Sequence, residues 1–75
     1  MTPAQCRAAR GWLNLSQTEL AAAAGTAVST VKDFEGERRK PIANNLMAIR
    51  AALEAQGVVF VDDEAALGIA VKKQR

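Results

Sequence analysis

Residues 16–34 read SQTELAAAAGTAVSTVKDF, and this stretch decides the fold because it predicts two short helices joined by a tight turn. Ser16 and Glu19 form a capping box, in which each side chain can accept the other residue's backbone N–H. Leu20, Ala21 and Ala24 recur at three- and four-residue spacing, which indicates one apolar helix face. Gly25 follows the last of them, where a left-handed backbone suits glycine best.

The second helix of the stretch has two different faces. Val31 and Phe34 share one face, whereas Val28, Ser29, Lys32 and Asp33 lie on the opposite side. This pattern matches a helix-turn-helix, in which the second helix enters the DNA major groove. An ordinary helical hairpin with a glycine turn is the alternative interpretation.

Length and composition exclude several function classes. The chain has 75 residues, 49% of them hydrophobic, and we expect one small folded domain. It contains no histidine and one cysteine, so the usual zinc ligands and Cys–His or Ser–His nucleophile pairs are missing. We therefore expect neither an enzyme nor a metal or cofactor. No apolar run is long enough for a membrane span and no leader pattern is present, which predicts a cytoplasmic protein.

The single cysteine, Cys6, cannot form an internal disulfide. Its spacing with Ala9 and Leu13 predicts a buried thiol in a reducing compartment. A redox-sensing role is the alternative.

Charge is unevenly distributed along the chain, whose net charge is +2. Six cations lie in the first forty residues, and an acidic cluster lies near the C-terminal end. A basic half remote from an acidic end is typical of a nucleic-acid binder, although charge runs are often simply solvated surface. The cations are Arg7, Arg10, Lys32, Arg38, Arg39 and Lys40, and the acidic cluster is Asp62, Asp63 and Glu64.

Helices are predicted on both sides of the central stretch. Thr2, Pro3 and Gln5 predict a helix start, and this helix should run to about Trp12 or Leu13. Its inward residues would be Cys6, Ala9 and Leu13, with Trp12 half-buried as a packing residue. Gly36 should end the third helix. A fourth helix is expected over residues 43–55, with a core face of Leu46, Ile49, Leu53 and also Met47.

The C-terminal part changes to a β pattern. Residues 58–61 and 68–72 are β-branched runs separated by a polar turn over residues 62–67, which predicts an antiparallel hairpin. Residues 73–75 should be frayed. The predicted fold is therefore mainly α, with a four-helix helix-turn-helix domain over residues 1–56. Residues 57–75 would form a hairpin and tail packed on the same domain or on a dimer partner.

Residues 2–55 resemble the lambda-repressor-like helix-turn-helix family, also called the Cro/repressor or XRE type. The resemblance covers about three-quarters of the chain. It rests on LSQTELA at residues 15–21, Gly25, STV at residues 29–31, Phe34–Glu35, and RRKP at residues 38–41.

The resemblance implies roles for the matching positions. Gln17 would hold a DNA phosphate or brace a base contact at a helix N-terminus. Val28, Ser29 and Asp33 would face the groove, and Thr30 and Lys32 would flank them. A pair between Arg10 and Glu35 would join the first and third helices. The DNA-binding residues implied are Gln17, Thr26, Val28, Ser29, Thr30, Lys32, Asp33, Arg38, Arg39 and Lys40.

Two positions depart from the family pattern. Ala27 stands where a Ser or Thr cap is usual, so Thr26 is the alternative cap for the third helix. Asp33 brings a negative charge towards DNA. It could accept from cytosine N4, or it could pair with a cation such as Arg38 and read no base.

The function expected from these features is a transcriptional regulator, a repressor that binds a near-palindromic operator as a homodimer. The alternative is an antitoxin-type protein-interaction module, in which the hairpin contacts a protein partner. A third possibility is a helix-turn-helix scaffold that does not bind DNA.

The hairpin is also a candidate dimer contact. Val59 and Val61, with Ile69 or Val71, would form an apolar surface that a second copy covers. Otherwise the hairpin caps its own domain, or the dimer contact lies on the fourth helix around residues 46–53.

Overall fold

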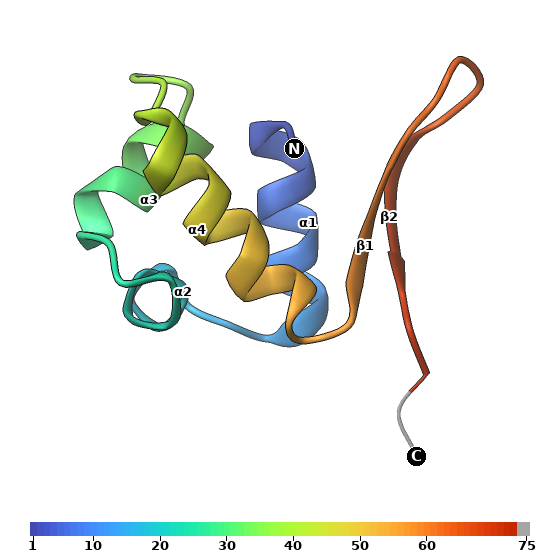
Figure 1. Cartoon of the computed structure of the whole chain (residues 1–75), viewed down its shortest axis with the longest axis horizontal. Coiled ribbons are helices and arrows are strands. Elements are labelled where there is room, and N and C mark those ends of the chain that lie inside the picture. Colours follow the sequence, from blue (N-terminus) through green and yellow to red (C-terminus); the bar gives the residue numbers. More distant parts are fainter. Residues whose placement is uncertain (74–75) are drawn as a thin grey trace.

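The computed structural model describes residues 1–73, so Gln74 and Arg75 of the predicted frayed end lie outside the described residues. Four helices are followed by a two-stranded antiparallel hairpin, as predicted (Figure 1). The elements are α1 (Pro3–Leu13), α2 (Gln17–Ala24), α3 (Val28–Glu35), α4 (Ala43–Glu54), β1 (Val58–Asp62) and β2 (Leu67–Val71). No helix among residues 1–73 combines the length and apolar character that a membrane crossing needs.

Side-chain caps begin the first two helices, which confirms both predicted capping boxes. Thr2 Oγ1 accepts from the Gln5 N–H at 3.1 Å, and Gln5 Oε1 accepts from the Thr2 N–H at 2.8 Å. The Ser16 and Glu19 pair repeats this arrangement with distances of 3.0 and 2.9 Å. Because the orphan donors of each first turn are satisfied locally, the start of both helices follows from sequence alone.

The turn between α2 and α3 is made as predicted, but the cap of α3 is not. Gly25 adopts the left-handed conformation with φ of 71°. Ala27 is the N-cap of α3 and no side chain caps that helix, so the predicted cap by Thr26 is wrong. The Thr26 hydroxyl oxygen is instead buried, with no hydrogen-bond partner among residues 1–73.

The core gathers small and medium apolar side chains from every helix and from β1. Its fully buried members include Leu20, Val31, Ile49 and Leu53, and Leu13 and Leu46 pack against them half-buried. Met47, proposed as an additional core residue, is 68% exposed. It lies on the opposite side of α4 from Ile49, because two residues span about 200° of an α-helix.

Trp12 was predicted to be half-buried and is instead 69% exposed. It lies at the last turn of α1, beside Leu13 and the end of β2 at Val71. The prediction fails because α1 meets the core with the face that carries Cys6 and Ala9, which leaves Trp12 outside the core.

The hairpin has an inner and an outer face, set by its register. Val58 pairs with Val71 and Phe60 with Ile69, and these residues pack on the helices. Val59 pairs with Ala70 and Val61 with Gly68 on the other side. The expectation that Ile69 or Val71 joins Val59 and Val61 is therefore wrong, since residues directly opposite in a sheet share a face. The connecting loop, residues 63–66, is shorter than predicted, and the Asp63 carboxylate accepts the N–H of Ala65 and of Ala66 at 2.8 Å.

One buried polar residue ties the hairpin to the helices. Gln5 is 4% exposed, and its Nε2 donates to the carbonyl oxygens of Val61 at 2.9 Å and Gly68 at 2.8 Å. The guanidinium of Arg50, on α4, lies 5.3 Å from the centre of the ring of Phe60, on β1. The hairpin thus forms a layer over α1 and α4, with α3 on the far side of these helices (Figure 1).

Candidate nucleic-acid interface

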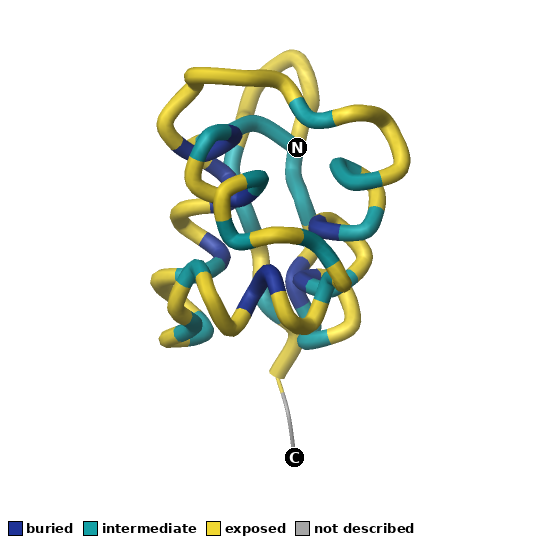
Figure 2. The backbone as a smooth tube through the Cα atoms, turned by 90° about the vertical axis from the view of Figure 1, so that its left-hand side faces the viewer, coloured by how far each residue is buried: buried dark blue, intermediate teal, exposed yellow. Residues whose placement is uncertain are grey.

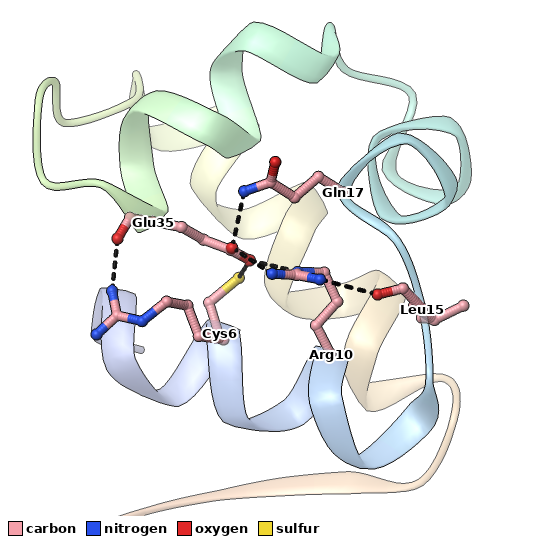
Figure 3. A network of polar contacts seen from close by, with 6 residues as sticks. Cys6, Arg10, Leu15, Gln17 and Glu35 are labelled. Atoms are coloured by element: carbon pink, nitrogen blue, oxygen red, sulfur yellow. Dashed lines mark hydrogen bonds and ion pairs between the residues drawn. The ribbon is translucent and has the colours of Figure 1, made fainter.

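A buried carboxylate organises the first three helices. Glu35, the last residue of α3, is 3% exposed, and its two oxygens accept from Arg10 Nη2 at 2.8 Å and Arg10 Nε at 2.9 Å (Figure 3). Gln17 Nε2 donates to the same carboxylate at 3.0 Å. The predicted Arg10–Glu35 pair is therefore confirmed, and its two-pronged geometry is the strong form of such pairs.

The protonation of Glu35 follows from these contacts. Burial by itself would raise the pKa of the carboxyl, but the hydrogen bonds from Arg10, Gln17 and Cys6 outweigh burial, so the pKa lies below its ordinary value. The hydrogen bond to Glu35 likewise raises the pKa of Arg10. Glu35 is an anion held among donors, and it fixes how α3 sits against α1 and α2.

Cys6 is part of the same network. Its Sγ lies 3.2 Å from Glu35 Oε2, and burial, followed by this hydrogen bond, raises the pKa of the thiol to about 12. The residue has no exposed surface. A buried protonated thiol reacts slowly with oxidants, which favours the interpretation of Cys6 as a core residue over a redox sensor.

The exposed side of α3 carries the groove-facing candidates. Ser29 and Lys32 are exposed, and Val28, Thr30 and Asp33 are half-exposed, whereas Val31 and Phe34 are buried beneath them. Figure 2 faces this side of the molecule, where buried positions are short interruptions in a mostly exposed or half-exposed trace. The alternation between the two sides of α3 follows the helical period, as predicted.

A basic concavity of about 390 Å³ lies along one flank of α3, next to the start of α2. Besides Gln17, Glu35 and Gly36, its lining consists of the cations Arg7, Arg10, Lys32 and Arg38. Arg7 Nη1 donates to the backbone oxygen of Glu35, which holds its guanidinium at the end of α3. Glu35 and Arg10 neutralise each other, so three positive charges remain around this concavity.

A second concavity of about 200 Å³ lies along the other flank of α3. Ser29, Thr30 and Asp33 form one wall, and Arg39, Lys40, Pro41, Ile42 and Asn45 form the other. The loop that carries the cations is held to α3, because the Arg38 N–H donates to the Asp33 carbonyl oxygen at 2.8 Å. The recognition side of α3 is therefore flanked by cations on both sides.

The carboxylate of Asp33 is not paired with Arg38. Among residues 1–73 the ion pairs are Arg10–Glu35 and Arg50–Glu54. Of the two roles considered for Asp33, pairing with Arg38 is absent here, which leaves the carboxylate beside Ser29 in the second concavity.

The candidate residues are brought together to different degrees. Gln17, Lys32 and Arg38 share the first concavity, and Ser29, Thr30, Asp33, Arg39 and Lys40 line the second. Val28 lies half-exposed at the start of α3. Thr26 stands apart because its hydroxyl oxygen is buried.

Sequence reasoning missed Arg7, Ile42 and Asn45 as members of this surface. Arg7 had a usable signal, since its three-residue spacing from Arg10 places both on one side of α1. Ile42 and Asn45 had none, because only the path of the loop after α3 brings them beside Ser29.

Comparison with known proteins agrees with this geometry. No curated protein matches the chain. A family model described as helix-turn-helix matches residues 7–57, which contain α2, the turn and α3 as well as the C-terminal part of α1 and the whole of α4. This match implies DNA binding and identifies no catalytic family. The chain belongs to the helix-turn-helix family of the Cro/C1, or XRE, type.

Proposed function

We propose that this protein is a sequence-specific transcriptional regulator, a repressor whose α3 helix reads the DNA major groove of a near-palindromic operator. The observation that carries the proposal is the pair of basic concavities on the two flanks of α3. An α-helix with its side chains is about 10–12 Å wide, close to the width of the major groove, about 12 Å. With α3 in the groove, each concavity lies against the phosphates of one rim.

Each of the two concavities would contact the phosphates of one DNA strand. Phosphate contacts supply affinity and position, and base contacts supply specificity. Arg7, Lys32 and Arg38 would hold one strand, Arg39 and Lys40 the other. Ser29 and Asp33 would reach base edges between them, where Asp33 can accept from cytosine N4.

Gln17 serves this site in an indirect way. Its Nε2 is held by Glu35, so the side chain is fixed at the N-terminus of α2 beside the first concavity. A phosphate bound there would meet a preset amide and the positive end of a helix dipole.

Two copies would occupy adjacent half-sites about 34 Å apart. The hairpin lies on the opposite side of α1 and α4 from α3 (Figure 1). A contact between hairpins would therefore point the two α3 helices away from each other. For an operator-bound dimer, the side of α4 that carries the exposed Met47 is a better contact than the hairpin. This is the alternative contact on the fourth helix, around residues 46–53.

Salt dependence of DNA binding tests the electrostatic part of the proposal. Fluorescence polarisation of a labelled duplex should show affinity falling by roughly 10³- to 10⁵-fold between about 50 and 200 mM salt, if a dimer makes about six to ten phosphate contacts. Arg39→Ala should weaken binding to all sequences alike and lower the salt slope by about one unit for each bound copy, which is about two units for a dimer. Lys73→Ala removes the same charge from the hairpin side and is the matched control. Equal effects of the two substitutions, or a salt-independent affinity, would contradict the proposed surface.

Base readout is tested separately by selecting bound DNA fragments and sequencing them. Ser29→Ala should fold normally, since Ser29 is exposed, and should change the preferred base at one position of each half-site. Val28→Ala should relax a preference for thymine, whose methyl group an apolar side chain can contact. Selection profiles identical to that of the unsubstituted protein would show that α3 does not read the bases.

A further inference from the structure

The outer face of the hairpin is apolar, and among residues 1–73 the helices α1 and α4 pack on its other side. It consists of Val59, Val61, Gly68 and Ala70, on the side of the strands away from α1 and α4. Val59 is 42% exposed. The candidate DNA interface uses none of these residues, so this face is available to a partner while α3 is on DNA.

A second copy cannot easily join the hairpin edge to edge. On the inner face, α1 lies against β2 and α4 lies against β1. Paired strands are about 4.8 Å apart, whereas packed helices need about 8–10 Å between their axes. Pairing β2 with its copy would force two α1 helices together, and pairing β1 would do the same for α4. Stacking the outer faces avoids this clash, because each helical layer then lies outside the stacked sheets.

Charge decides how two outer faces would stack. The tip of the hairpin carries Asp63 and Glu64 in its loop, and its base carries Lys72, two residues after Ala70 of the outer face; all three are exposed. Two stacked identical faces related by a two-fold axis lie either tip on tip or tip on base. Tip on tip opposes carboxylates to carboxylates, whereas tip on base opposes them to lysines, twice by symmetry. Charge complementarity therefore selects the tip-on-base arrangement.

We propose that the hairpin joins two copies of this chain back to back, tip on base, through its outer faces. Strands of this length give a face about 17 Å long and about 10 Å wide, on the order of 200 Å² in each copy. A stable interface buries about 1,000 Å² or more in total. The association is accordingly weak, and it becomes effective when DNA brings copies close together.

Back-to-back association has a functional consequence that rests on the proposed DNA binding. Because α3 and the hairpin lie on opposite sides of α1 and α4 (Figure 1), the pair presents its two α3 helices outward. Each helix can then bind a separate DNA segment. The pair bridges two segments, which one helix-turn-helix unit cannot do.

Charge-reversal substitutions at the tip and at the base of the hairpin test the association without DNA. Glu64→Lys and Lys72→Glu each turn two attractive contacts into repulsive ones, so each should lower the association constant roughly tenfold in sedimentation equilibrium. Both positions are exposed, so folding should be unaffected. The double variant restores both attractions and should associate as the unsubstituted protein does. Tip-on-tip stacking instead predicts no rescue, and equal constants for all four proteins would overturn the proposal.

Bridging is tested with two short duplexes, one immobilised on beads and one fluorescently labelled. The unsubstituted protein should capture the labelled duplex on the beads, Lys72→Glu should lose most of this capture, and the double variant should recover it. Polarisation with one duplex should be the same for all three proteins, since the hairpin is remote from α3. Loss of single-duplex binding in every protein would refute the proposed function. Normal single-duplex binding without rescue of capture would refute the bridging inference alone.

Discussion

Removal of the Glu35 carboxylate is the sharpest test of how this small domain holds together. The Glu35 side chain is 2% exposed and that of Arg10 is 23% exposed. In Glu35→Ala, two nitrogens of Arg10, the Gln17 amide and the Cys6 thiol all lose their common acceptor. Breaking a buried pair costs about 3–5 kcal/mol. Because water can reach part of Arg10, we expect a cost near the lower end, about 3 kcal/mol.

A loss of this size is large for a domain whose total stability should lie near the low end of about 5–15 kcal/mol. Urea unfolding followed by far-ultraviolet circular dichroism measures it. Trp12 fluorescence is a poorer signal, since the indole is already 69% exposed in the folded state. We expect Glu35→Ala to shift the urea midpoint strongly to lower concentration with little change in slope.

The double variant Arg10→Met, Glu35→Leu distinguishes the cost of losing the ion pair from the cost of leaving Arg10 partly buried without a partner. Replacing both charges with apolar groups removes the stranded cation. The Leu15 carbonyl oxygen then loses its donor, Arg10 Nη1 at 3.0 Å, and the Gln17 amide and the Cys6 thiol still lose their acceptor. The double variant should cost about 2 kcal/mol, below the cost of Glu35→Ala alone, because no charge is left buried without a partner. A cost for Glu35→Ala under about 1 kcal/mol, the value of an exposed pair, would refute the reasoning. Additive effects in the double variant would refute it equally.

Three further outcomes are expected. Because the pKa of Glu35 is lowered in the folded state, its pair with Arg10 stabilises the fold at pH values above the unfolded-state pKa of about 4.3. This contribution is lost as the pH falls through the folded-state pKa. Below about pH 5, the urea midpoint of the unsubstituted protein should therefore fall more than that of Glu35→Gln. Thr26→Val replaces a buried hydroxyl that lacks a partner with a methyl group of similar size, so it should raise the free energy of unfolding by about 1 kcal/mol. An unchanged or lowered free energy of unfolding would show that water or a moved neighbour hydrogen-bonds to the hydroxyl. Gln5→Ala removes the hydrogen bonds to Val61 and Gly68 and also the capping bond from the Thr2 N–H, so it should cost about 3 kcal/mol. It should speed hydrogen exchange in the hairpin more than in α3, whereas uniform acceleration would show that the hairpin docks by its apolar face alone.

Local chemistry predicted the start of α1 and α2 and the turn between α2 and α3. The capping boxes at Thr2 and Ser16, and Gly25 after the last apolar position of α2, act within a few residues of chain, so no distant contact is needed to interpret them. The cap of α3 failed for the opposite reason. Whether the Thr26 side chain reaches the first turn of α3 depends on tertiary packing, and in the folded chain its hydroxyl oxygen is buried without a partner.

The candidate DNA surface was predicted in part. The helical period placed Ser29, Lys32 and Asp33 opposite Val31 and Phe34, and the loop cations were visible as a run. Neither signal shows that Arg7 comes from α1 to the end of α3, where it donates to Glu35. That contact spans 28 residues along the chain and depends on how α1 crosses α3.

Sequence by itself determined what depends on neighbours along the chain: four helices, a hairpin, one turn with a left-handed glycine, and an α3 helix with one apolar and one polar side. Only the tertiary structure decided which faces are covered. It left Trp12 and Met47 exposed, turned Ile69 and Val71 inward, and put the hairpin opposite α3. The physical reason is that a periodic pattern shows which residues share a face. Strand register and the crossing of helices select the face that the core covers.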